Sequence, residues 1–216
     1  MSDQNKKLTP LGKAMAKQMI KSWEAPQFQL ETEIDCKRII EYRESVGFKP
    51  SFTTILVKAA ADTLLKFPVL NSSWDDDCII VHDKVNMGIA VDTQRGLLVP
   101  VIRDAGEKSI REIHEAMEAI KIKSQRGNFT MEEMKDATFT VSNLGKFNIT
   151  SFKAIVNAPE AAILAVSKMT DVPVVRSGNI VPARIMRISL SVDHRVADGA
   201  TGARFLTELA IALENL

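Results

Sequence analysis

The residues with the clearest chemical potential lie near the C-terminus, in the stretch 187–205, where His194 follows a run of alternating apolar and polar residues. The alternation over 188–192 predicts a half-buried strand, and the apolar spacing over 200–216 predicts a helix. A histidine at the end of a strand, where the backbone breaks before a helix, can be held rigidly with one ring nitrogen free. Because imidazole titrates near neutral pH, such a nitrogen is a candidate general base.

A carboxylate and a glycine accompany this histidine. Asp198 stands four residues after His194 and can orient the neighbouring backbone or an arginine, with Arg195 and Arg187 as the candidate cations. Gly199 permits a turn that a side chain would obstruct. A lone histidine at a strand end is more often a structural hydrogen-bonding group than a catalyst, so the stretch needs support from the rest of the chain.

The elements that must position these residues follow from capping residues and apolar spacing. Helices are predicted after Thr9, from Asp35 to about Val46, from Ser51 or Thr53 to Phe67-Pro68, after Ser109, and over 200–216. Strands are predicted over 27–34, 78–81, 85–91, 97–102, 137–141 and 188–192, with a turn at 74–77. The runs within 78–102 are apolar without clean alternation, which predicts strands covered on both faces. Helices mixed with this many strands indicate a mixed α/β domain.

Composition bounds the class of protein. A chain of 216 residues is long enough for one large domain with a substantial core. Its 28 basic and 27 acidic residues leave a formal charge of +1, so nothing predicts nucleic acid or an anionic membrane as a partner. Cys36 and Cys78 form no disulfide framework and lack metal-ligand spacing, so no metal site is predicted. No signal-peptide core or membrane-length apolar run is present, which predicts a soluble, cytoplasmic protein.

The run DHRVADGA, residues 193–200, resembles the active-site signature of the acyltransferase component of 2-oxoacid dehydrogenase complexes. Segments similar to that family follow the family's order at 10–22 (PLGKAMAKQMIKS), 85–103, 137–145 (ATFTVSNLG) and 155–167. They cover nearly the whole chain, so the resemblance implies a single acyltransferase catalytic domain over 1–216, with no lipoyl domain and no peripheral-subunit-binding domain. It also implies a fold similar to chloramphenicol acetyltransferase: an α/β (mixed) two-layer sandwich of a mixed β-sheet with helices, assembled as a trimer.

The same resemblance implies roles for individual residues. It implies His194 as the general base that takes a proton from a thiol, and Ser142 as the donor to the oxyanion formed when a thioester carbonyl is attacked. Asp198 is implied as a structural residue that holds the His194 loop. Beside these, Asn143 could hydrogen-bond at the site and is a candidate for binding the cofactor substrate. Without the resemblance, Ser142 is interpreted as a strand-end serine that satisfies its own turn beside Gly145.

The implied activity is that of a dihydrolipoyllysine-residue acyltransferase, which moves an acyl group between coenzyme A and a dihydrolipoyl thiol without a metal. In the related enzymes the two substrates reach the histidine from opposite sides of a subunit interface, so His194 and Ser142 are expected to meet from different chains of a homotrimer. The lipoyl group is expected in trans from a lipoyl-bearing protein, beside 2-oxoacid dehydrogenase components. Acetyl or a short branched acyl group is favoured, because no extra cationic residue near the motifs awaits a succinyl carboxylate.

Departures from the family pattern leave alternatives open. The family usually carries arginine near Lys13 and histidine where Gln27 stands, and the chain stops at Leu216 without the apolar tail that joins trimers in large cores, which predicts an isolated trimer. A freestanding acetyltransferase acting on a small hydroxyl or amine, as chloramphenicol acetyltransferase does, needs the same base. A non-catalytic trimeric scaffold keeps the fold, although it has no physical need for all three site residues.

Overall fold

The computed structural model describes residues 7–216, and the polar N-terminal lead over residues 1–6 lies outside the described residues. The helices are α1 (Pro10–Trp23), α2 (Lys37–Ser45), α3 (Phe52–Leu64), α4 (Ile110–Ser124) and α5 (Gly199–Glu214), with short 3₁₀ turns at Pro68–Leu70 and Glu132–Met134. The strands are β1 (Gln27–Asp35), β2 (Ser72–Asp75), β3 (Cys78–Val81), β4 (Met87–Thr93), β5 (Gly96–Leu98), β6 (Val101–Ile102), β7 (Phe139–Asn143), β8 (Ala162–Arg176) and β9 (Asn179–Asp193).

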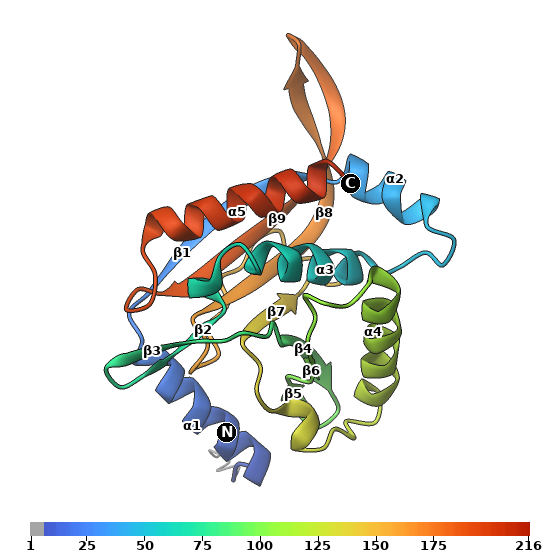
Figure 1. Ribbon diagram of the computed structural model, residues 1–216. Coiled ribbons are helices and arrows are strands. Elements are labelled where there is room, and N and C mark those ends of the chain that lie inside the picture. The colour runs from blue at the N-terminus through green and yellow to red at the C-terminus, as the bar shows by residue number, and fades with distance from the viewer. Residues whose placement is uncertain (1–6) are drawn as a thin grey trace, which may run out of the picture.

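Seven strands form one mixed sheet, in the order β1-β9-β8-β7-β4-β5 with β6 also paired to β4, while β2 and β3 form a separate hairpin. Strand β7 runs parallel to both β4 and β8, and the remaining pairs are antiparallel. Figure 1 shows α3 and α5 lying across the sheet, and the far end of the β8–β9 hairpin projecting from it (orange, top). The predicted mixed α/β fold is confirmed, and the trimer stays a prediction.

The two faces of the sheet differ in chemistry. On β9 the residues Ile188, Leu190 and Val192 belong to the hydrophobic core beneath the helices. The intervening Ser189 and Ser191 are also buried, on the opposite face, where Ser191 Oγ donates to the carbonyl of Ala154 in the segment before β8. Ser142 of β7 is in register with Ser189 through Ala165 of β8, so it shares this polar face.

Local sequence sets most of the helix starts. Thr9, Ser51 and Ser109 each accept a hydrogen bond from the backbone N–H three residues later, and Ser109 completes a capping box. The predicted caps at Thr9 and Ser109 are confirmed, and of the two candidates for the start of α3, Ser51 is the cap and Thr53 is not. The predicted cap at Asp35 is wrong. Cys36 occupies the N-cap of α2 without a side-chain bond, and Asp35 is the last residue of β1, from which its carboxylate binds the backbone N–H two residues on.

Several predicted strand limits need correction. The turn predicted over 74–77 is shorter, because Trp74 and Asp75 pair within β2. The run 97–102 divides into β5 and β6 because Pro100 has no N–H for the ladder. The strand predicted to end at Val141 continues to Asn143, so Ser142 lies inside β7.

Strand β3 contradicts the prediction of strands covered on both faces. Its residues Ile79, Ile80 and Val81 are 42–54% exposed, because the β2–β3 hairpin stands apart from the main sheet. Within the described residues, no helix is long and apolar enough to cross a membrane.

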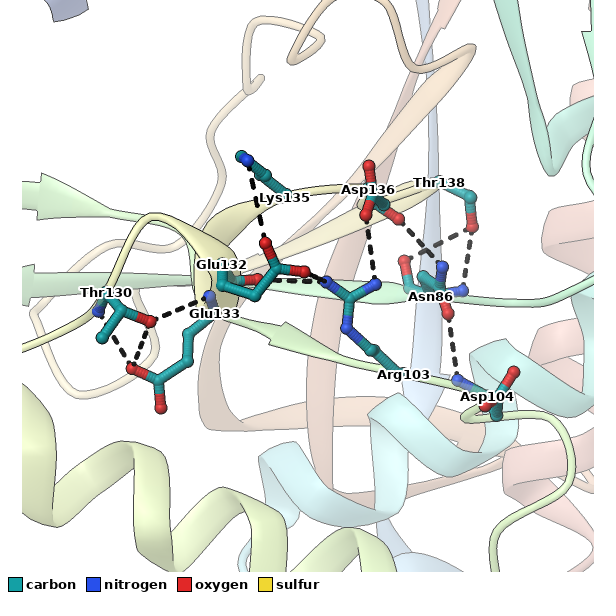
Figure 2. Close-up of polar contacts among 9 residues, drawn as sticks. All are labelled: Asn86, Arg103, Asp104, Thr130, Glu132, Glu133, Lys135, Asp136 and Thr138. Carbon is teal, nitrogen blue, oxygen red and sulfur yellow. Dashed lines mark hydrogen bonds and ion pairs between the residues drawn. The ribbon is translucent and has the colours of Figure 1, made fainter.

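A polar network fixes the chain where it enters β7 (Figure 2). The backbone N–H of Asn86 donates to Thr138 Oγ1 at 3.0 Å, and its amide nitrogen donates to the carbonyl of Asp136 at 2.9 Å. Arg103 then binds the Asp136 carboxylate and the Glu132 carbonyl. The ion pair is exposed and contributes little alone, but with the backbone bonds it fixes the start of β7, three residues before Ser142.

Candidate active site

Ser142 has the geometry of an available donor. It is half-buried inside β7, and its hydroxyl makes no hydrogen bond to any described residue. Ser142 is also among the residues that line a cavity of about 680 Å³, together with residues of α3, α4, β4, β5, β8 and β9. Its hydroxyl, which has no internal partner, is therefore available to a group bound beside it.

The turn after β7 is satisfied by Asn143 instead. Its Oδ1 accepts from the backbone N–H of Gly145 at 2.7 Å, and its Nδ2 donates to Thr53 Oγ1 in α3 at 2.9 Å. A Cβ at Gly145 would lie 2.9 Å from the Ser167 carbonyl oxygen, so only glycine lets the chain pass there without a shift. Asn143 lines the cavity, but both ends of its amide are used inside the chain, which favours a positioning role over ligand binding.

His194 lies at the other end of the sheet, directly after β9. Its backbone N–H donates to the carbonyl of Pro26 at 2.8 Å, and its ring lies against the Phe28 ring with centroids 4.7 Å apart. The residue is exposed, and its ring nitrogens make no hydrogen bond to any described residue. The strand end thus fixes the imidazole on one side and leaves its nitrogens free.

Asp198 acts on the backbone and not on an arginine. It is the N-cap of α5, where its carboxylate accepts from the backbone N–H of Thr201 at 2.8 Å. This bond holds the pKa of Asp198 below its usual range. The predicted structural role near His194 is consistent with this cap, but both candidate cations, Arg195 and Arg187, bind other carboxylates.

Arg195 stabilises the end of β9. Its guanidinium binds both carboxylate oxygens of the buried Asp193, at 2.6 Å from Nη2 to Oδ2 and 3.0 Å from Nε to Oδ1, and lies 4.8 Å from the centre of the Trp74 ring. The Asp193 carboxylate keeps the pKa of Arg195 above its usual value. Because Asp193 and Arg195 flank His194, the pair limits how far the histidine backbone can move.

Within one chain, Ser142 and His194 do not meet. Ser142 is in register with Ser189 two strands away, and His194 follows Ser189 by five residues, about 17 Å along the strand. His194 is not among the described residues that line the Ser142 cavity. The structure therefore places the two predicted catalytic residues apart within one chain.

One polar residue beside the site was not predicted from the sequence. Glu160 is 2% exposed, and its carboxylate accepts hydrogen bonds from Thr140, two residues before Ser142, and from Asn157. Its sequence neighbours gave no sign of this, because the contact with β7 depends on tertiary structure. No group of three or more His, Cys, Asp or Glu side chains in the part of the chain that the structure describes is arranged to hold a metal ion.

The sequence model for the catalytic domain of 2-oxoacid dehydrogenases acyltransferase matches residues 1–216. The dihydrolipoyllysine-residue acetyltransferase components of the pyruvate dehydrogenase complex from Staphylococcus epidermidis and Staphylococcus aureus are 39% and 38% identical over 219 aligned positions. Each alignment covers 97% of this chain and 51% of the relative, so the chain spans about half the length of these relatives.

Solved structures agree with this. A probable dihydrolipoamide acetyltransferase from Listeria monocytogenes matches with a TM-score of 0.93 and 33% identity, covering 99% of this chain and 95% of that one. Dihydrolipoamide acetyltransferase from Azotobacter vinelandii matches with a TM-score of 0.93 and 34% identity, covering 99% and 92%. Chloramphenicol acetyltransferase, with a TM-score of 0.61 and 14% identity over 92% of each chain, shows the shared fold alone.

The Azotobacter vinelandii enzyme offers a comparison of residues. A serine, a histidine and an asparagine have been investigated there for their role in the catalytic mechanism. The serine and histidine have the same separation in sequence as Ser142 and His194, and the asparagine follows its histidine by four residues, as Asp198 follows His194.

Proposed function

The chain belongs to the family of 2-oxoacid dehydrogenase acyltransferases, as the catalytic domain, and from this we propose that it transfers an acyl group between coenzyme A and a dihydrolipoyl thiol. The observation that carries the proposal is that two side chains have no hydrogen-bond partner among the described residues. They are the hydroxyl of Ser142, a residue of the cavity lining, and the imidazole of His194, which follows the strand end held by Arg195 and Asp193. Their spacing in sequence equals that of the serine and histidine studied in the Azotobacter vinelandii enzyme. The proposed transferred group is acetyl or a short branched acyl group.

The chemistry follows from these two groups. His194 removes the proton of the coenzyme A thiol, because an ordinary thiol pKa of about 8.5 leaves little thiolate at neutral pH. The thiolate attacks the carbonyl carbon of the acyl-dihydrolipoyl thioester, and Ser142 donates a hydrogen bond to the resulting oxyanion. When the tetrahedral intermediate collapses, the dihydrolipoyl thiolate leaves and takes the proton back from His194.

The separation of Ser142 and His194 supports a site assembled between copies of the chain, in a homotrimer. Apolar side chains left exposed on α1 and β3 are consistent with further burial against a neighbour: Trp23 is 72% exposed, Ile20 67% and Val81 54%. The catalytic match occupies residues 1–216, so the lipoyl group comes from outside this span. The proposed partners are therefore a lipoyl-bearing protein and the other components of a 2-oxoacid dehydrogenase complex.

The test is transfer of acetyl from acetyl-coenzyme A to free dihydrolipoamide, with the unmodified protein compared with His194→Ala at equal concentration. We expect measurable transfer by the unmodified protein and loss of at least 100-fold in kcat in the variant, in line with the loss of a general base. Absence of transfer by the folded, unmodified protein would contradict the proposal. A panel of small amines and hydroxyls would then test for a different acceptor.

A further inference from the structure

The buried carboxylate of Glu160 joins two parts of the chain that the proposed mechanism uses. Its Oε2 accepts from Thr140 Oγ1 at 2.6 Å, and its Oε1 accepts from Asn157 Nδ2 at 2.7 Å. It is 2% exposed and forms no ion pair with any described residue. Both carboxylate oxygens are therefore committed to internal bonds of defined direction.

Thr140 connects this carboxylate to Ser142. The two residues are two positions apart on β7, so their side chains share the polar face of the sheet. The neighbouring strand leaves room for the contact, because a Cβ at Gly88 would lie only 2.7 Å from Thr140 Oγ1. A side chain at position 88 would push the threonine hydroxyl away from Glu160.

The backbone on the other side of Glu160 reaches the His194 strand end. The carbonyl of Ala161, the next residue, accepts from the backbone N–H of Asp193 at 2.9 Å. Asn157, which holds the second carboxylate oxygen, also accepts a bond from Gln18 of α1 at 3.2 Å. Glu160 thus lies between the strand that carries Ser142 and the strand that leads to His194.

Burial of this carboxyl works against stability, because no cation compensates it. The groups that face it are the Thr140 hydroxyl from β7 and the Asn157 amide from its own loop, and both are uncharged. Burial raises the pKa of Glu160 to about 7. Because an uncompensated buried acid costs stability, a requirement for defined geometry is the better reason for an acid here.

We propose that Glu160 is a positioning residue of the acyl-transfer site, which sets the place of Ser142 relative to the His194 strand end through Thr140. The inference rests on the proposed function. In an interface site, Ser142 and His194 of one chain serve two different active sites, so Glu160 links the two half-sites that each chain contributes.

The experiment compares Glu160→Gln and Thr140→Val with Thr63→Val in the acetyl-transfer assay. Thr63 is the control: it is a buried threonine of α3, and its hydroxyl donates to the carbonyl of Ala59 in the same helix at 2.7 Å, away from β7 and Glu160. We expect kcat to fall at least about tenfold in the first two variants, with both KM values changed less than about twofold, and kcat of Thr63→Val to stay within about twofold. The double variant Thr140→Val/Glu160→Gln should be no worse than either single variant. An unchanged kcat in Glu160→Gln and Thr140→Val, or an equal loss in Thr63→Val, would overturn the inference.

A second readout separates this inference from the proposed function. In a Ser142→Cys background, the rate at which iodoacetamide alkylates the new thiol reports the position of β7 without any turnover. We expect Glu160→Gln to change this rate at least about threefold and Thr63→Val to leave it unchanged. If the unmodified protein transfers no acetyl group, the proposed function fails, and the alkylation rates alone decide whether Glu160 positions residue 142. Equal rates in all three backgrounds would reject that role.

Discussion

At the scale of single residues, adjacent side chains on β7 have different roles: one stabilises the turn, and the other is available for chemistry. Ser142 and Asn143 are adjacent on β7, yet only Asn143 makes internal side-chain bonds, to Gly145 and Thr53. Since the asparagine completes the turn, the serine hydroxyl stays free for the cavity. The interpretation of Ser142 as a serine that satisfies its own turn therefore finds no support in the geometry.

This division predicts opposite effects of two adjacent substitutions. Ser142→Ala should lower kcat by about 100- to 1000-fold, as expected for loss of an oxyanion donor, and leave the free energy of unfolding unchanged within about 0.5 kcal/mol. Asn143→Ala removes two internal hydrogen bonds and should lower the free energy of unfolding by about 1 to 3 kcal/mol. Urea denaturation and acetyl-transfer kinetics on both variants check this. A Ser142→Ala protein that keeps full activity would contradict the assigned role.

The Glu160 carboxyl predicts a dependence of stability on pH. Its pKa in the folded chain is about 7 against an ordinary value of 4.5, so the folded state binds the proton more tightly than the unfolded state. The wild-type protein is then most stable, with respect to this group, below pH 4.5 and loses about 3 kcal/mol as the pH rises to about 7. Glu160→Gln does not titrate, so the variant should gain stability relative to wild type over this window. Denaturation curves at several pH values measure the difference, and curves that stay parallel from pH 4.5 to 8 would show that burial does not raise this pKa.

At the scale of elements, the start of α5 determines how the chain leaves the His194 strand end. Asp198 is the N-cap of this helix, and helix starts favour a short side chain with an acceptor oxygen. Aspartate and asparagine satisfy this requirement almost equally well.

We predict that Asp198→Ala lowers the melting temperature by about 2 to 4 °C and that Asp198→Asn lowers it by less than half as much. Because the Thr201 N–H holds the pKa of Asp198 below its usual range, the stabilisation by the carboxylate is present above the unfolded pKa and is lost as the pH falls through the lowered folded value. Calorimetry at neutral and acidic pH tests both statements. Equal losses in the two variants at neutral pH would rule out capping as the role of this residue.

Elements defined by local signals were predictable, and those defined by distant contacts were not. The caps at Thr9 and Ser109 depend on bonds within one helical turn, so the sequence predicts them directly, and it narrows the start of α3 to Ser51 or Thr53, of which Ser51 is the cap. The long β8 strand was not predicted, because its mixed run from Ala162 to Arg176 lacks clean alternation and its pairing with β9 is tertiary. Strand β3 was predicted, but its predicted burial on both faces was wrong, since an apolar sequence alone does not show whether another element covers it.

The same distinction holds for the site. Ser142, His194 and Asp198 were identified by family resemblance, and their local settings could be anticipated from strand and cap patterns. Their separation in one chain depends on the strand order and on two inter-strand registers, which no local pattern reveals. The contact of Glu160 was not predicted for a similar reason, because its partner Thr140 lies on a strand, 20 residues earlier in the sequence.

At the scale of the whole molecule, the proposed site between copies would have each chain contribute to two sites, because Ser142 and His194 lie apart within one chain. In a closed ring of three copies, every interface then combines Ser142 of one chain with His194 of the next. Such an arrangement makes activity depend on assembly. The isolated chain would hold both residues and still lack a complete site.

Mixing two inactive variants tests this arrangement directly. Ser142→Ala chains retain His194, and His194→Ala chains retain Ser142, so a trimer that contains both variants has one interface with both groups intact. If equal amounts are unfolded together and refolded, three quarters of the trimers are mixed, and one site in three of each is complete. We therefore expect recovery of about a quarter of the wild-type activity, with a particle mass of three chains. A mixture of His194→Ala with the double variant Ser142→Ala/His194→Ala supplies no intact histidine and should recover nothing. Failure of the first mixture to exceed this control, once mixed trimers are verified by mass spectrometry, would mean that both groups act from the same chain. The offset of about 17 Å along the sheet, at least five times the length of a hydrogen bond, argues against that outcome.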